Sequence, residues 1–318
     1  MLGRLLLLVV VALAAAPFAL ADGSPVPGGA DGVLAPGGKV RYLAVADGRR
    51  TMVEQIQVAG VRLLRVRSVA GTWVVPGVAF DGTAGGLSGD GGTLVLAVPP
   101  TSAHPTWSDF QVVRTRDLAP VQRVHLKGSF SYDALSPDGS KLYLIQHMSA
   151  PNLSRYVVRS YDLARRRLLP GRIADRTQRG WVMAGWPVAR ATSVDGRWVY
   201  TLYARPGGTP FVHALDAVRG IAHCVGIPWR GSDQNALWRL RLSVRDGGRT
   251  LSLHWPSGRG FLAVTRGSWR ISHPAATPTG STFPWWIAGV AGGALLLGAA
   301  LLALRRTSYG LRARAATN

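Results

Sequence analysis

Histidine, cysteine and carboxylate side chains are the residues of this 318-residue chain that could hold a metal or move protons. The seven histidines show no H-E-x-x-H spacing, and no G-x-S-x-G sequence supplies a serine nucleophile. His213 and His223 flank one predicted turn and are expected to face each other across a hairpin, but two imidazoles need a third ligand to hold a metal. The sequence therefore predicts no catalytic residues, no metal site and no cofactor.

The numbers of cysteine and glutamate residues exclude two further kinds of site. Cys224 is the only cysteine, so no internal disulfide can form, and its apolar neighbours predict a small buried residue. Glu54 is the only glutamate, which excludes a glycosidase-type pair of glutamates. The 15 aspartates are dispersed along the chain, and their convergence on one site in the folded protein stays open.

The formal net charge of +21 comes almost entirely from arginine. The chain has 34 Arg and three Lys against 15 Asp and one Glu, a usage typical of a GC-rich bacterial genome. The arginines are scattered through strand-like runs instead of forming a basic tail or helix, so we expect no nucleic-acid partner. The excess charge favours anionic neighbours outside the cell, such as a wall polymer or lipid headgroups.

Aspartate and glycine interrupt strand-like runs at four places along the chain. The stretches are LSGDGGTLVLA (87–97), LSPDGSKLYLI (135–145), TSVDGRWVYTL (192–202) and SVRDGGRTLSL (243–253). Asp supplies the side-chain hydrogen bond and Gly the positive φ of a tight turn, so each stretch predicts a hairpin and not a reactive site. A second hairpin, with an aspartate before its turn, follows each of the first three.

The spacing of these hairpins predicts the fold. Asp90, Asp138, Asp195 and Asp246 are 48, 57 and 51 residues apart, and the second-hairpin aspartates follow the first three at 27, 24 and 21 residues. A period near 50 residues made of four strands is the signature of a β-propeller blade. Less regular units at 40–80 and 241–272 flank the three clear ones. We therefore predict an all-β propeller over residues 35–272 with five four-stranded blades, six or seven being alternatives.

The repeat also resembles a known family. The pattern S-x-D-G-x-x-L-Y, followed by a strand carrying x-x-D-L, resembles the YVTN-type and related WD-like repeats of bacterial extracytoplasmic β-propellers. The likeness is clearest around Asp138 and Asp195. It implies the fold but no single activity, because binding proteins, lactonases, dehydrogenases and scaffolds share this architecture.

The N-terminal sequence predicts secretion. Residues 1–21 place one Arg before a long apolar run and end on Ala19-Leu20-Ala21, the small-x-small pattern of a signal-peptide cleavage site. An uncleaved membrane anchor is the alternative. Residues 22–34 are expected to form a flexible segment before the propeller.

The C-terminal sequence predicts a membrane anchor. Residues 273–283 form a Pro/Thr-rich linker, and residues 284–304 are an uncharged apolar run long enough to cross a bilayer as a helix. The basic tail at 305–318 places the C-terminus in the cytoplasm by the positive-inside rule, which leaves the propeller outside the cell. Gly289 and Gly293 form a small-xxx-small pair that would allow two such helices to dimerise.

The loops between the second and third strands of each unit are the expected ligand-contact region, because they are long and lack turn residues. They supply His104, Trp107, Arg155 and Arg205 as contact candidates. The leading hypothesis is a membrane-anchored, non-catalytic module that binds a ligand, a cell-surface protein or an anionic wall polymer. The alternative is a propeller enzyme, a lactonase-like hydrolase or quinoprotein-like dehydrogenase, with a metal or cofactor in the central channel.

Overall fold

A computed structural model describes most of the chain between Gly29 and His273. It covers residues 29, 31–99, 105–149, 152–175, 177, 183–205, 207–230 and 234–273. The predicted signal peptide and membrane segment lie outside the described residues, as do the basic tail and all of the linker after His273. Within the described ranges, no helix combines the length and the apolar character needed to cross a membrane.

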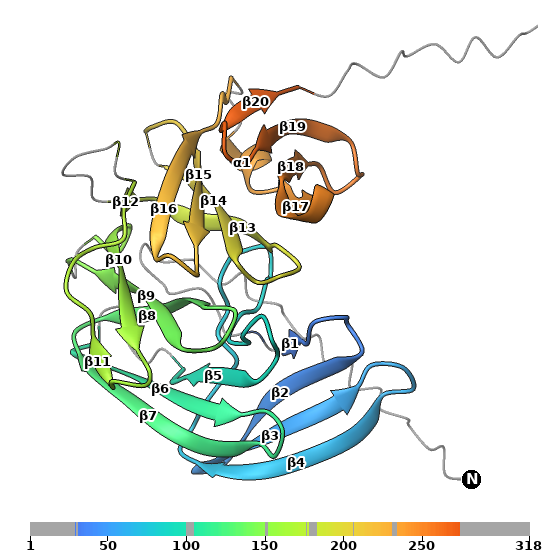
Figure 1. The fold of residues 1–318 in the computed structure, drawn as a ribbon, viewed down its shortest axis with the longest axis vertical. Helices are drawn as coiled ribbons and strands as arrows, with labels where there is room; N and C mark the ends of the chain where they lie inside the picture. Colours follow the sequence, from blue (N-terminus) through green and yellow to red (C-terminus); the bar gives the residue numbers. More distant parts are fainter. Residues whose placement is uncertain are drawn as a thin grey trace, which may run out of the picture. The chain divides into compact units, whose positions relative to one another are not determined.

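The regular secondary structure of the described residues is almost entirely β-strand and forms five antiparallel sheets, each from its own stretch of the chain (Figure 1). Sheet 1 contains β1 (Val33–Leu34), β2 (Val40–Asp47), β3 (Arg50–Gln57) and β4 (Arg62–Ala70). Sheet 2 contains β5 (Thr93–Ala97), β6 (Trp107–Arg114) and β7 (Ala119–Lys127). Sheet 3 contains β8 (Phe130–Leu135), β9 (Lys141–His147), β10 (Arg155–Asp162), β11 (Arg167–Leu168) and β12 (Met183–Ala184).

The last two sheets complete the series. Sheet 4 contains β13 (Trp186–Thr192), β14 (Trp198–Ala204), β15 (Phe211–Asp216) and β16 (Ile221–Gly226). Sheet 5 contains β17 (Arg241–Arg245), β18 (Thr250–His254), β19 (Gly260–Thr265) and β20 (Arg270–Ser272). The short helix α1 (Gln234–Leu237) and the 3₁₀ turn η1 (Asp246–Gly248) accompany sheet 5.

Strand order within the sheets follows chain order. In sheets 1, 4 and 5 each strand pairs with the next one along the chain, as do β8 to β11 in sheet 3. This four-stranded meander is the construction of propeller blades. Sheet 2 departs from the predicted four strands, because it contains only β5, β6 and β7 among the described residues. The hairpins predicted around Asp138 and Asp195 are the β8–β9 and β13–β14 pairs.

The first unit differs from the sequence prediction. Residues 40–80 were expected to hold its four strands, but three strands fill 40–70 and the fourth is the short β1 upstream. Residues 71–87 instead make isolated bridges, including Val74 to Ala97 of β5. Pro76 has no N–H to give to a ladder, and Gly82 adopts a positive φ of 88°, so this segment does not continue as a strand.

Apolar side chains fill the spaces between consecutive sheets. One buried cluster joins sheets 1 and 2, a second joins sheets 2 and 3, two join sheets 3 and 4, and a fifth joins sheets 4 and 5. Among the described residues, none of these clusters joins sheet 5 to sheet 1. Sheets 2 to 4 therefore bury both faces, whereas sheets 1 and 5 each pack through one.

A hydrogen-bond network explains the recurring Ser-x-Asp-Gly sequence. In the β8–β9 turn, the Asp138 carboxylate accepts hydrogen bonds from the Ser136 hydroxyl and the Ser140 N–H, while Ser136 Oγ accepts one from the Lys141 N–H at 2.9 Å. Equivalent bonds hold the turns of sheets 2 and 4, built on Ser88 with Asp90 and on Ser193 with Asp195. The motif is thus a turn lock that fixes the hairpin.

The fourth aspartate of the predicted series does not build this turn. Asp246 begins η1 and has a positive φ of 53°, and the nearest upstream serine, Ser243, lies three residues before it and not two. The shifted spacing removes the serine hydroxyl from the position where the other three turns use it. The predicted hairpin is present as the β17–β18 pair, but its turn lacks the serine–aspartate network of the other three.

Candidate functional site

The turns of sheets 2, 3 and 4 meet at one end of their sheets. The Asp90 N–H donates to the carbonyl oxygen of Pro137 at 2.9 Å, which joins the turns of sheets 2 and 3. Gly89 lies against Gly196, and a Cβ atom added to Gly196 would approach the Gly89 Cα to 2.7 Å. Gly196 also has a positive φ of 69°, so both its conformation and this close approach require glycine.

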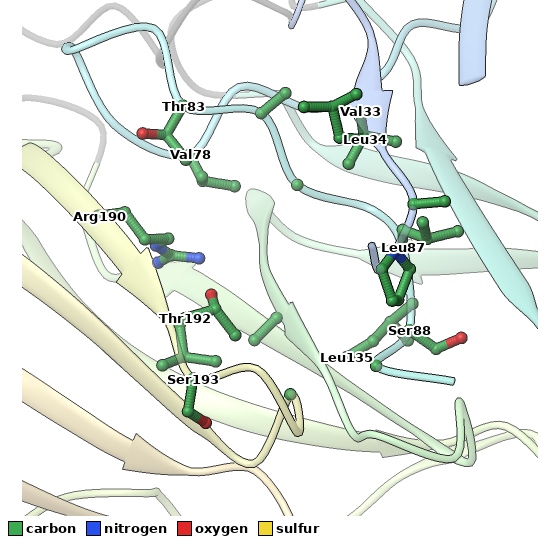
Figure 2. A pocket seen from close by; sticks show the side chains of 18 of the residues that line it. Val33, Leu34, Val78, Thr83, Leu87, Ser88, Leu135, Arg190, Thr192 and Ser193 are labelled. Carbon is green, nitrogen blue, oxygen red and sulfur yellow. The ribbon is translucent and has the colours of Figure 1, made fainter. Parts of the chain in front are cut away.

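A cavity of about 370 Å³ opens beside these turns (Figure 2). Four of the five sheets contribute to its wall: β1 with the turn after it, the segment from Thr83 to Gly89 that leads into sheet 2, β8, and β13 with the turn after it. The volume lies in the range of small-molecule sites, which are concave, largely apolar and carry a few polar groups.

The wall of this cavity combines apolar side chains with hydroxyl groups and other polar atoms. Its apolar members are Val33, Leu34, Ala35, Pro36, Val78, Ala84, Leu87, Ala134, Leu135, Val194 and Val199. Hydroxyl groups come from Thr83, Ser88, Tyr132, Thr192 and Ser193. Figure 2 shows Arg190 and Thr192 projecting from the same strand, as residues two apart in a strand must.

One buried ion pair forms part of the wall. Arg190 of β13 donates one hydrogen bond to the Asp133 carboxylate and a second to the Asp133 backbone oxygen, and both side chains are almost fully buried. Its third donor, Nε, reaches Thr201 Oγ1 at 2.9 Å. Burial alone would lower the pKa of Arg190, but the nearby Asp133 carboxylate outweighs it and keeps that pKa above its usual range.

A row of polar side chains continues from Arg190 across sheet 4. The strand register sets Arg190 opposite Thr201, Thr201 opposite His213, and His213 opposite Cys224. Residues directly opposite in neighbouring antiparallel strands point to the same face of the sheet, so all four side chains face sheet 3. Polar groups therefore extend from the cavity wall to the last strand of sheet 4.

His213 is a neutral, buried member of this row. Its Nδ1 lies 3.5 Å from Cys224 Sγ, and its Nε2 has no hydrogen-bond partner among the described residues. Burial lowers the pKa of His213 to about 4, so the imidazole is uncharged near neutral pH. Burial, with the Asp175 charge, raises the pKa of the Cys224 thiol, which agrees with the buried and unreactive cysteine predicted from sequence.

The expectation that His213 and His223 face each other across a hairpin was wrong. His213 is opposite Cys224, and His223 is opposite Ala214, so the two rings point to opposite faces of sheet 4. His223 stacks on Trp269 of sheet 5 with ring centroids 4.4 Å apart, and its Nδ1 lies 3.1 Å from Asp175. A shift of one residue in the pairing of β15 with β16 would place the two rings on the same face, and the sequence spacing does not determine this register.

The predicted ligand-contact residues that the structure describes do not line the cavity. His104 is outside the described residues. Trp107 begins β6, is half exposed, and stacks on His125 with centroids 4.6 Å apart. Arg155 begins β10 opposite Ala184, and Arg205 is exposed after β14. None of the three lines the cavity, and their contact with a ligand stays a prediction.

Sequence reasoning missed Asp133 and Arg190. The available signal was a charged residue in each of two runs that otherwise read as buried strands, SYDAL and PVARAT. A lone charge in such a run must find a partner when it is buried, because an unpaired buried charge is costly. Their pairing across 57 residues depends on the packing of sheet 3 on sheet 4, which the sequence pattern does not contain.

The described residues include no group of three or more His, Cys, Asp or Glu side chains placed to hold a metal ion. Asp175 with His223 is a two-residue contact at the edge of sheet 4, where the Asp175 carboxylate also accepts the Cys224 N–H at 2.9 Å. One carboxylate oxygen thus fixes the last strand of sheet 4, and the other accepts hydrogen bonds from the Thr177 N–H and hydroxyl group.

Comparison with known proteins finds likeness in structure alone. No protein-family model matches the sequence, and no curated protein matches it. TolB from Acinetobacter baumannii aligns with a TM-score of 0.44 and 15% identity over 76% of this chain and 53% of TolB. The chain therefore spans about half the length of that protein.

Two further structures give similar values. An oligogalacturonate lyase in complex with manganese aligns with a TM-score of 0.44 and 14% identity, over 78% of this chain and 65% of the lyase. The Dos1 propeller aligns with a TM-score of 0.43 and 10% identity, over 77% of this chain and 58% of that one. Their functions differ, and at these identities the likeness concerns the fold and no activity.

Proposed function

We propose that the chain is a membrane-anchored extracytoplasmic β-propeller that binds a ligand in its cavity without changing it chemically. One observation carries the proposal: four sheets converge on a cavity in which the charged lining side chains, Asp133 and Arg190, are bonded to each other. Such a wall offers shape, apolar area and hydroxyl groups to a ligand. These are the features of a binding site.

The chemistry of the wall favours a neutral ligand. Each nitrogen of the Arg190 guanidinium already donates one hydrogen bond to Asp133 or Thr201, and the Asp133 carboxylate balances its charge. The pair therefore presents no net charge that would attract a carboxylate or phosphate. The apolar residues around Val33 and Leu135 would bury hydrocarbon, and the Thr192 hydroxyl can exchange a hydrogen bond with the ligand. A largely apolar molecule or peptide segment with a few hydrogen-bonding groups fits this wall best.

The proposed anchor follows from the sequence after the last sheet. β20 ends at Ser272, and the Pro/Thr-rich linker begins at the next residue, followed by the apolar run at 284–304 and the arginines of the tail. A single span with the tail in the cytoplasm would hold the propeller at the outer surface of the cell membrane. Helix pairing through Gly289 and Gly293 is part of the same proposal.

Sheet 5 supports a second, weaker attraction to anionic neighbours such as a wall polymer. Residues 234–273 contain one carboxylate, Asp246, and seven arginines at 239, 241, 245, 249, 259, 266 and 270. In the described part of the chain, none of these arginines forms an ion pair with a carboxylate. Unpaired positive charge concentrates polyanions near a surface, with little chemical selectivity.

The enzyme alternative is tested by elemental analysis and an absorption spectrum of the purified full-length chain. The binding proposal predicts neither a stoichiometric transition metal nor a visible chromophore. Either one, retained through purification at one equivalent per chain, would favour a propeller enzyme and would direct mutagenesis to the aspartates and histidines around the bound group.

A further inference from the structure

Sheet 1 has an apolar face that no other described sheet covers. Tyr42, Val53 and Val69 point to the face that packs on sheet 2. Because side chains alternate along a strand, the residues between them point to the opposite face, which we call the outward face of sheet 1. Its apolar members are Leu43, Val45, Met52, Ile56, Leu63 and Val66.

These side chains are open to solvent in the described chain. Leu63 is 52% exposed, Val45 is 47% exposed and Val66 is 43% exposed, and Leu43, Met52 and Ile56 are half-buried. They occupy adjacent positions on three neighbouring strands, so they form a continuous patch and not scattered residues. A contiguous exposed apolar patch marks an interaction surface.

The corresponding face of sheet 5 is built differently. Leu242, Leu251 and Val264 pack on sheet 4, so the alternate residues of sheet 5 point outward. Apart from Ala263 they are polar: Arg241, Ser243, Arg245, Thr250, Ser252, His254, Thr265, Arg270 and Ser272. A polar outer face is typical of the terminal unit of an array. The polar outward face of sheet 5 is therefore suited to contact with solvent, whereas the apolar outward face of sheet 1 is suited to contact with another protein surface.

The charges on the outward face of sheet 1 indicate which partner it accepts. Glu54 sits opposite Leu43 and Val66 in the middle of the patch, half-buried, and forms no hydrogen bond or ion pair with another described residue. Arg41 lies on the same face one ladder position away, opposite Ile56. Arg41 also donates a hydrogen bond to the Asp31 carbonyl oxygen, and Asp47 and Arg50 lie opposite each other farther along the same face. A partner whose surface carries a single sign of charge would bring like charges together at Glu54 or at Arg41, which is costly.

We propose that the outward face of sheet 1 is the interface between two copies of this chain. A two-fold axis between the positions of Glu54 and Arg41 places each Glu54 against the Arg41 of the other copy, so the contact is made twice and both charges are paired. The apolar residues around them then meet their own counterparts. The interface is independent of the ligand proposed for the cavity and of the proposed helix contact.

The test measures the mass of the full-length chain in detergent across a range of concentrations. Gly289→Leu and Gly293→Leu are present throughout, so that helix pairing does not contribute. Val45→Glu places a charge in the patch, and Val218→Glu is its matched control, because Val218 is also 47% exposed but lies in the β15–β16 turn of sheet 4. We expect a dimer for the parent and Val218→Glu, and dissociation at least tenfold easier for Val45→Glu.

Charge exchange separates the two-fold contact from other kinds of association. Glu54→Arg and Arg41→Glu should each weaken the dimer, because each brings like charges together, and the double variant should restore it. Thermal midpoints equal to that of Val218→Glu would show that the variants fold. A parent chain that is monomeric at every concentration would overturn the proposal, as would equal association of Val45→Glu and Val218→Glu or a double variant no tighter than the single ones.

Discussion

Arg190 of β13 donates hydrogen bonds to both the side chain and the backbone of Asp133 in β8, so one guanidinium joins sheets 3 and 4 at the cavity wall. The pair does two things at once. It satisfies the charged groups that the cavity would otherwise expose to a ligand, and it connects the wall to the polar row that ends at Cys224. Its removal therefore has consequences for stability as well as for binding.

Arg190→Met should strongly destabilise the protein. Methionine fills part of the same space but leaves the Asp133 carboxylate buried without a partner, a change that costs about 3–5 kcal/mol in other proteins. Urea unfolding of the full-length chain, followed by the signal of its β-sheets, measures the loss. The double variant Asp133→Leu with Arg190→Met removes both charges and should recover most of the loss; a double variant as unstable as the single one would contradict this role for the pair.

The buried His213 predicts acid sensitivity. Its pKa of about 4 in the folded chain lies below the ordinary value of 6.5, because burial, with the Arg190 charge, lowers this pKa by more than the Asp133 and Asp175 charges raise it. Above pH 6.5 the imidazole is neutral in both states. Between pH 6.5 and 4 the unfolded chain binds a proton that the folded chain does not, so the free energy of unfolding falls by up to about 1.4 kcal/mol per pH unit.

His213→Phe should flatten that part of the pH profile, since phenylalanine does not titrate. The matched control is His273→Phe, because His273 is exposed at the end of the described fold. Denaturant unfolding between pH 4 and pH 8 compares the slopes. Equal slopes for the parent and His213→Phe would show that His213 is not the group responsible.

The turn lock predicts that equivalent aspartates in the sequence have unequal effects. Asp138→Ala removes the acceptor of the Ser136 hydroxyl and of the Ser140 N–H, and should cost about 1–3 kcal/mol. Asp246→Asn should cost less than about 0.5 kcal/mol, because the Asp246 side chain makes no hydrogen bond within the described part of the chain and asparagine tolerates the positive φ of this position. Unfolding free energies of the two variants, measured side by side, decide the matter; similar losses would contradict the different construction of the fourth turn.

Val61 predicts a stabilising change. This valine lies in the β3–β4 turn, is 79% exposed and has a φ of 46°, a left-handed conformation that a β-branched residue rarely adopts. Val61→Gly should raise the free energy of unfolding by about 0.5–1 kcal/mol. Val58→Gly, in the same turn without a positive φ, should lower it by a similar amount. Thermal unfolding of both variants gives the comparison, and a loss of stability in Val61→Gly would refute the strain argument.

The sequence predicted the repeating hairpins well because local chemistry encodes them. Ser136, Asp138 and Gly139 fix a turn within five residues, and alternation on either side defines the two strands. The same reasoning placed Glu54 in a strand and Cys224 in the interior. These features depend on neighbours along the chain, so the sequence contains the necessary information.

The cavity was not predictable in this way, because its wall combines residues from four sheets. Long loops suggested a site at the opposite ends of the strands, at Trp107, Arg155 and Arg205, whereas the cavity lies beside the short turns. The Asp133 to Arg190 contact in that wall forms only when sheet 3 packs on sheet 4. The faces of His213 and His223 were unpredictable for a similar reason, because a shift of one residue in the strand register moves a side chain to the other face of the sheet.

Binding in the cavity is tested most directly by ligand-observed NMR with a library of neutral fragments and the purified full-length chain. Thr192→Trp fills the cavity from β13, and Thr265→Trp is the matched control at an exposed position of β19. We predict that fragments bind the parent and Thr265→Trp, are recovered unchanged, and lose binding at least tenfold in Thr192→Trp. Binding that Thr192→Trp leaves intact, or a fragment converted to product by the parent, would contradict a non-catalytic binding cavity.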